Sequence, residues 1–403
     1  MNERRLRELL RDHPIPGRED AEERAWHVAR AAFEERAPEA RPARCPRGRL
    51  AIALAAALAL AAALALSPAG AKVGDLIGDV VDPGRERAEP VLTELPAGGR
   101  LLVESEQGPW IVGRDGSKRL LGDYDEAAWS PQGLFVAATR GRELAAVVAD
   151  AEAVGEPAGT VRWTLSRSGR ISDPAWTGPD LASRIAYRSG DSLRVVAGDG
   201  TDDRLLDPRV ADTPPAWKPG RGHVLAYADK DGRVRVVDAD SDRELWTGRF
   251  ATDVRQLDWS ADGSRLLALS NDFVTVLDER GRFIGKRATQ GGAQTATFSP
   301  TADRIALVRT AANAKAGDSA LVLVDPKTLE ERRLFTGPGR FTDVAWSPNG
   351  EWLLLAWRDA DQWLFVRPRD EQPDAVSNIS RQFDPGEAGD TSFPRVSGWC
   401  CPR

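Results

Sequence analysis

Few residues of this chain have the types and spacing that catalysis or metal binding requires. Of its three histidines, only His223 lies in the long C-terminal part of the sequence. A Ser-His-Asp site there would have to use His223, which stands at the start of a predicted strand and is expected to be structural. No G-x-S-x-G, H-E-x-x-H, P-loop or G-x-G-x-x-G motif occurs in the required setting. We therefore predict that the chain is not an enzyme and has no catalytic residue, cofactor or metal.

The cysteines and one acidic run are the remaining candidates for chemistry. Cys45, Cys400 and Cys401 give neither a disulfide framework nor a C-x-x-C metal spacing. Cys400 and Cys401 follow Trp399, and two roles stay open for them. They either occupy a turn, or form a vicinal disulfide or redox-sensitive pair outside the reducing cytoplasm. The acidic run at residues 238–242 lacks the EF-hand pattern and is expected to be a solvated turn.

A motif of the form aromatic-Ser-Pro-x-Gly recurs along the chain, most completely after Trp129 and Trp346. The aromatic residue that starts each copy is here called the anchor, and six of them form a series: Trp129, Trp176, Trp217, Trp259, Phe298 and Trp346. They are separated by 47, 41, 42, 39 and 48 residues, a period typical of repeat architectures.

Each anchor is followed by short apolar segments that predict strands, such as residues 266–269 and 274–277, with an Asp/Gly turn before the last strand. Four short strands per repeat are typical of a propeller blade, in which Pro and Gly make the turn and the aromatic ring fills the space between neighbouring sheets. The motifs resemble the TolB-like, WD40-like (PD40) propeller repeats, whose hallmark is Trp-Ser-Pro-Asp-Gly. Thr177, Lys218 and Phe298 depart from that hallmark. The resemblance implies an all-β propeller.

The two ends of the repeat region complete each other. Residues 96–103 read as a turn and strand, and residues 110–112 and 118–121 as two more, so this blade lacks its first strand. Residues 393–399 resemble residues 341–346 and form a first strand without a blade, with Trp399 as a seventh anchor. Pairing these segments would remove two open sheet edges. We predict a seven-bladed propeller with one composite blade; the alternative is six blades with a terminal extension.

An apolar run precedes the repeats. Residues 50–66 are 17 consecutive apolar residues, and no charge follows until Lys72. At 1.5 Å per residue they span about 26 Å, close to the hydrocarbon thickness of a bilayer. Arginines concentrate on the N-terminal side, at positions 41, 44, 47 and 49, so the N-terminus is expected to be cytoplasmic. The alternatives are a signal peptide cleaved near Ala71 and a buried soluble helix.

These features predict four parts: a cytoplasmic helical segment (1–49), a transmembrane signal-anchor helix (50–71), a membrane-proximal linker (72–95) and an extracytoplasmic propeller (96–403). The layout resembles that of transmembrane anti-sigma factors in the bacterial cell envelope, although the zinc-type His-x3-Cys-x2-Cys motif is absent after His27. The resemblance implies signalling across a single-pass membrane protein. Residues 1–49 are then expected either to hold a cytoplasmic partner or to be a solvated tail.

Charge argues against nucleic acid as a partner. The formal net charge is −6, and residues 1–49 carry 12 basic and 10 acidic side chains, so no part of the chain is strongly basic. We expect a non-enzymatic binding or scaffold module that takes a protein or envelope ligand on one propeller face. The alternative is a hydrolase or lyase that uses the central funnel, for which the sequence shows no convergent acids, histidines or metal ligands.

Overall fold

A computed structural model describes residues 92–178, 182–220, 222–250, 253–289, 291–311, 317–370, 372–384 and 392–401. Its contacts divide the chain into two units, Met1–Ala71 and Lys72–Arg403, and every described residue belongs to the second. The expected cytoplasmic segment, the signal-anchor helix and residues 72–91 of the linker lie outside the described residues. Within the described part, no helix has the length and apolar character needed to cross a membrane.

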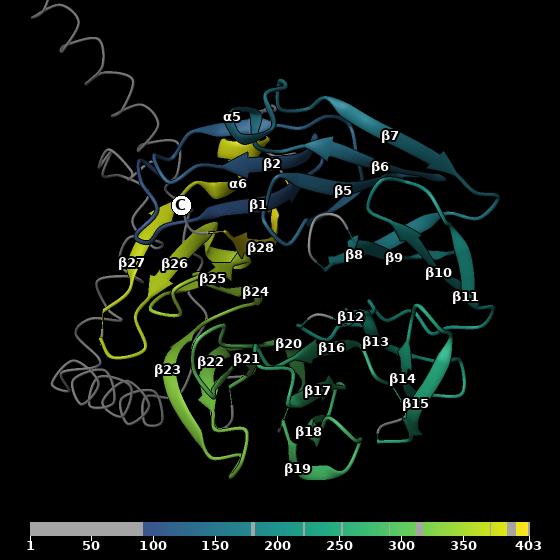
Figure 1. Cartoon of the computed structure of the whole chain (residues 1–403). Helices are drawn as coiled ribbons and strands as arrows, with labels where there is room; N and C mark the ends of the chain where they lie inside the picture. The colour runs from purple at the N-terminus through teal and green to yellow at the C-terminus, as the bar shows by residue number, and fades with distance from the viewer. Residues whose placement is uncertain are drawn as a thin grey trace, which may run out of the picture. The chain divides into compact units, whose positions relative to one another are not determined.

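Seven four-stranded antiparallel sheets, the blades, surround a common centre (Figure 1). The first three in chain order are β4 (Glu126–Trp129), β5 (Phe135–Arg140), β6 (Glu143–Val148) and β7 (Val161–Ser166); β8 (Ile171–Thr177), β9 (Arg184–Ser189), β10 (Ser192–Ala197) and β11 (Arg204–Asp207); and β12 (Ala216–Trp217), β13 (Val224–Ala228), β14 (Val234–Asp238) and β15 (Arg243–Gly248).

The next three blades repeat this order. They are β16 (Gln256–Trp259), β17 (Arg265–Leu269), β18 (Phe273–Asp278) and β19 (Phe283–Ala288); β20 (Ala293–Phe298), β21 (Ile305–Thr310), β22 (Ser319–Val324) and β23 (Glu331–Gly337); and β24 (Phe341–Trp346), β25 (Leu353–Trp357), β26 (Gln362–Val366) and β27 (Asp374–Ser377). The described residues also form short helical segments that the sequence did not predict, namely α5 (Ala151–Val154), η2 (Arg358–Ala360) and α6 (Ile379–Phe383).

The seventh blade joins the two ends of the propeller. Its order is β28 (Arg395–Cys400), β1 (Arg100–Ser105), β2 (Gly108–Val112) and β3 (Lys118–Leu120). Residue Trp399 lies opposite Leu101 in the antiparallel β28–β1 pair. The prediction of six repeat blades and one composite blade is therefore confirmed, and the six-bladed alternative is wrong. Contacts between successive innermost strands, from β4 through β8, β12, β16, β20, β24 and β28 back to β4, close the ring.

Burial changes from the middle to the outside of each blade. The two middle strands are covered on both faces by neighbouring sheets, so they are continuous apolar runs, such as the fully buried β25. Outer strands such as β7 and β19 are mostly exposed. The apolar segments that predicted strands in the sequence are therefore the second and third strands of the blades.

Hydrogen bonds explain the Ser-Pro-x-Gly turn between the first two strands. The Ser347 hydroxyl accepts from the Trp352 backbone N–H at 2.9 Å and donates to Asn349 at 2.7 Å. Ser260 makes the same pair of contacts with Arg265 and Asp262. The glycine that follows has a φ of about +70°, as at Gly350, a conformation that favours glycine.

Candidate functional site

The innermost strands enclose a cavity of about 630 Å³. Its wall consists mainly of residues from β16, β20, β24 and β28. All innermost strands start at the same end of the ring and finish with an anchor at the other end. Counted from the anchor, residues therefore correspond in depth to within one position, because β20, β24 and β28 each contain a bulge that β16 lacks. The cavity-lining residues four positions before the anchors are called here the mouth layer: Arg255, Gln294, Thr342 and Arg395.

The anchor residues lie at the end of the innermost strands that is opposite the mouth layer. Each is the last or second-last residue of its strand: Trp129 in β4, Trp176 in β8, Trp217 in β12, Trp259 in β16, Phe298 in β20, Trp346 in β24 and Trp399 in β28. Three indole N–H groups donate to a carbonyl of the preceding innermost strand: Trp217 to Ala175 at 2.9 Å, Trp259 to Ala216 at 3.2 Å and Trp346 to Thr297 at 3.3 Å. These three anchors thus link their blades to the preceding blade.

Carboxylates lie along the innermost strands and reach across to the next blade. Asp258 accepts from the Phe298 backbone N–H at 2.7 Å and from the Thr297 hydroxyl at 3.0 Å. Glu126 accepts from the Asp173 backbone N–H at 2.5 Å. Because the channel side of an innermost strand has no strand partner, these acids satisfy backbone donors that would otherwise be unpaired.

Burial changes the acidity of three of these acids. It raises the pKa of Asp258 to about 6 and also raises the pKa values of Asp343 and Glu126, because the charged form loses solvation. Glu104 on β1 forms an ion pair with Arg395 at 3.7 Å and accepts from the Ala127 backbone N–H at 2.7 Å. Partly buried acids near one channel therefore exist, although the sequence analysis found no convergent candidates.

A positional signal could have indicated these acids. Glu126, Asp173 and Asp343 each lie three residues before an anchor, and Asp258 lies one residue before Trp259. They were missed because an isolated Asp or Glu within a polar, alternating strand looks like a solvated residue until the innermost strands are placed around one axis. Within the described residues, no group of three or more His, Cys, Asp or Glu side chains is arranged to hold a metal ion.

His223 lies immediately before β13. Its side chain is 7% exposed, and Nδ1 lies 2.5 Å from Asp240 Oδ2. The Trp217 ring meets the imidazole edge-to-face, with centroids 6.3 Å apart. Its buried position beside an anchor fits a contribution to packing. The acidic run at residues 238–242 forms the turn between β14 and β15, where Asp238 accepts backbone N–H groups from residues 240 and 241.

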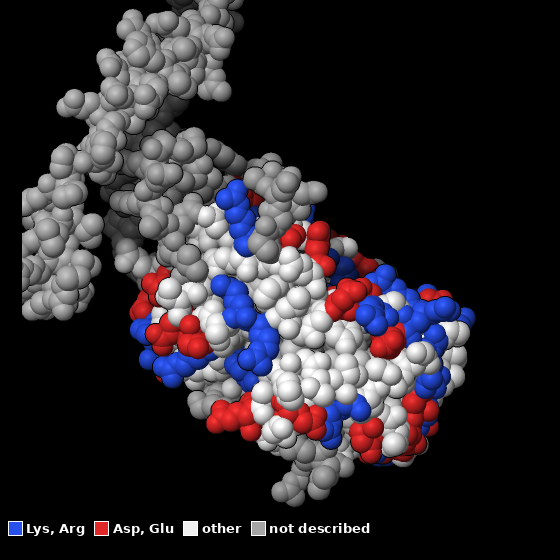
Figure 2. Space-filling model, turned by 90° about the horizontal axis from the view of Figure 1, so that it is seen from above, with Lys and Arg blue, Asp and Glu red and all other residues white. Residues whose placement is uncertain are grey.

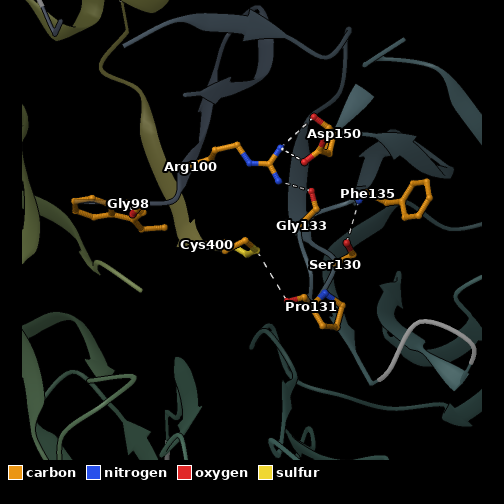
Figure 3. Close-up of a disulfide and its surroundings, with 11 residues drawn as sticks. Gly98, Arg100, Ser130, Pro131, Gly133, Phe135, Asp150 and Cys400 are labelled. Carbon is orange, nitrogen blue, oxygen red and sulfur yellow. Dashed lines mark hydrogen bonds and ion pairs between the residues drawn. A yellow bond between two sulfur atoms is a disulfide. The ribbon is translucent and has the colours of Figure 1, made fainter. Parts of the chain in front are cut away.

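Cys400 and Cys401 form a disulfide at the end of β28, beside the turn that follows β4 (Figure 3). Cys401 Sγ lies 4.0 Å from the Pro131 carbonyl oxygen. Arg100, which lies opposite Cys400 in the sheet, donates to the Gly133 carbonyl at 2.7 Å and pairs with Asp150 at 3.4 Å. The disulfide and Arg100 thus connect the composite blade to the next blade. Cys45 lies outside the described residues.

Surface charge is mixed. Figure 2 shows basic and acidic side chains interspersed over the face in view, with wide uncharged areas between them. Many charged side chains of the described residues are paired, such as Lys230 with Asp191 at 2.8 Å and Arg235 with Glu244 at 3.0 Å. A face of this kind lacks the continuous positive field that recognises a nucleic-acid backbone.

Solved structures share the fold at low sequence identity. A chain in a crystal structure of the mitotic checkpoint complex is 16% identical, with a TM-score of 0.53 over 72% of this chain and 95% of that chain. A putative 6-phosphogluconolactonase from Bacteroides uniformis is 17% identical, with a TM-score of 0.50 over 70% of this chain and 97% of that chain. No protein-family model and no curated protein matches the sequence. The comparisons show a β-propeller fold alone, and the PD40 resemblance stays an expectation from the motifs.

Proposed function

We propose that the chain is a non-enzymatic binding module whose ligand enters the central cavity through the mouth layer. One observation carries this proposal: a cavity of about 630 Å³ whose mouth is formed by exposed or half-buried polar side chains. That volume lies within the range of about 300–1,000 Å³ typical of ligand pockets. The buried acids beside it already accept backbone N–H groups, which fits a structural role. Their raised pKa values keep acid–base catalysis as the second candidate.

Blocking the mouth tests this proposal. In the full-length chain, Gln294→Trp places a large side chain at an exposed position of the mouth layer, and Leu245→Trp places the same side chain on the outer strand β15. We expect the wild type and Leu245→Trp to retain a common ligand from a cell-envelope extract, and Gln294→Trp to lose it, as measured by native mass spectrometry. Equal retention by both variants would refute the cavity as the site. A ligand that comes back chemically altered would favour the enzyme.

We further propose that residues 50–71 tether the propeller to the outer face of the cell membrane, with residues 1–49 in the cytoplasm. The 17-residue apolar run and the arginines before it support this orientation. After reduction of intact cells, a membrane-impermeant thiol reagent should label Cys400 or Cys401 and leave Cys45 unlabelled. The reverse pattern would overturn the orientation, and labelling in soluble material alone would argue for cleavage of the apolar segment.

Signalling across the membrane completes the proposal. Ligand binding outside would change what residues 1–49 hold inside, in the manner of an anti-sigma factor. The layout of the sequence supports this idea, since the helical segment expected at residues 1–49 is too short to form a stable domain alone. Residues 1–49, used as bait, should retain a specific cytoplasmic protein; recovery of chaperones alone would leave the propeller as a tethered binding module without a signalling output.

A further inference from the structure

Two arginines belong to the mouth layer on strands that are well separated around the ring. Arg255 lies four residues before Trp259 at the β16 edge, and Arg395 lies four residues before Trp399 on β28. The innermost strands β20 and β24 stand between them, and all four strands line the same cavity. Both arginines therefore line one cavity from different walls.

Both guanidinium groups keep donors that the protein does not use. Arg255 is exposed and donates to the Ala293 carbonyl, and no ion-pair partner for it occurs among the described residues. The Arg395 side chain is 62% exposed, and its ion pair with Glu104 is long at 3.7 Å. Glu104 is itself engaged by the Ala127 backbone N–H. Since a guanidinium carries five N–H donors, each arginine can bind a further acceptor.

The side chains around the two arginines are also compatible with a ligand that accepts hydrogen bonds. Gln294 and Thr342 complete the mouth layer with neutral side chains that can donate hydrogen bonds. The acid that lines the cavity is Asp343, and desolvation raises its pKa. Asp173, on β8 outside the cavity lining, is paired with Arg188 at 2.8 Å. The charged residues of the cavity lining are therefore two arginines and one acid.

We propose that the central cavity binds an oxyanion of its ligand, a carboxylate or a phosphate, between Arg255 and Arg395. Charge-assisted hydrogen bonds from arginine to such groups are among the strongest in proteins, and a concave site strengthens them by excluding water. This inference rests on the proposed function of the cavity as a ligand site. It adds the chemical group that the mouth layer recognises.

Titration of the full-length chain in detergent with three probes tests this inference. The probes are inorganic phosphate, glucuronate, and glucose as the uncharged analogue of glucuronate. Tryptophan fluorescence is a suitable signal because Trp346 and Trp399 line the cavity. We expect phosphate, glucuronate or both to bind more tightly than glucose, which also tells the two oxyanions apart. Arg255→Gln and Arg395→Gln should each weaken that binding about tenfold.

Two further variants keep the outcome decisive. Gln294→Glu adds a negative charge to the mouth layer without removing an arginine, and should also weaken anion binding. Arg249→Gln removes an exposed arginine after the outer strand β15 and should leave binding unchanged. Anion binding that is insensitive to both Arg255→Gln and Arg395→Gln would overturn the inference. If neither anion binds, yet Gln294→Trp still abolishes retention of the envelope ligand, the cavity is a binding site and the oxyanion inference alone fails.

Discussion

Replacing Trp399 with alanine should lower the free energy of unfolding by about 3–5 kcal/mol. Trp399 is 8% exposed, meets the Phe365 ring edge-to-face at 5.9 Å, and donates from its indole N–H to the Gly98 carbonyl at 3.1 Å. It lies on the one strand that joins the C-terminal end of the propeller to its N-terminal end. The truncation therefore leaves a cavity where the ring closes. Urea unfolding of the full-length chain, followed by circular dichroism, measures the effect.

Two variants calibrate this result. Trp399→Phe keeps most of the ring and loses the indole hydrogen bond, so it should cost about 1 kcal/mol for that bond plus a smaller packing loss. Phe283→Ala removes an aromatic ring that is 56% exposed on the outer strand β19, and should cost about 1 kcal/mol or less. If Trp399→Ala costs no more than Phe283→Ala, the composite blade does not contribute to ring closure in solution.

Much of the fold could be predicted because the same local sequence pattern recurs in each blade of a propeller. The Ser-Pro-x-Gly turn depends on contacts within a few residues, as between Ser347 and Trp352, so its residue types recur wherever the turn recurs. The composite blade could be predicted because residues 393–399 repeat the first-strand pattern of residues 341–346, while the blade at residues 96–121 lacks a first strand. Helices α5 and α6 were missed, since segments of four and five residues carry too little periodicity.

The candidate site could be predicted much less well. Arg255 and Arg395 are distant in sequence, and their position in one layer follows only from the common direction of the innermost strands. The contacts of the acids could not be predicted from the sequence either, because a contact such as that from Glu104 to the Ala127 N–H crosses from one blade to the next. A sequence shows that an acid is three residues before an anchor. It does not show which neighbouring backbone donor that acid will meet.

Ionisation of Asp258 should lower the free energy of unfolding of the propeller as the pH rises from about 4 to above 6. Its pKa in the folded protein, about 6, exceeds the ordinary value of 3.8, so the folded state binds this proton more tightly than the unfolded state does. The resulting stabilisation is complete below pH 4 and is lost as the pH rises through 6; a shift of this size corresponds to about 3 kcal/mol. Asp258→Asn removes the charge and keeps an oxygen that can accept from the Phe298 N–H.

The variant should therefore match the wild type near pH 3 and exceed its free energy of unfolding at pH 8 by about 1–3 kcal/mol. Asp262, four residues further on, is the matched control with the opposite sign. Hydrogen bonds from Ser260 and Ser264 lower the pKa of Asp262 to about 2, so Asp262→Asn should destabilise the protein at pH 8, and less so as the pH falls. Urea unfolding at both pH values separates the two. If Asp258→Asn is destabilising at pH 8, the hydrogen bonds from Phe298 and Thr297 outweigh the burial of the charge, and the pKa of Asp258 is not raised in the folded protein.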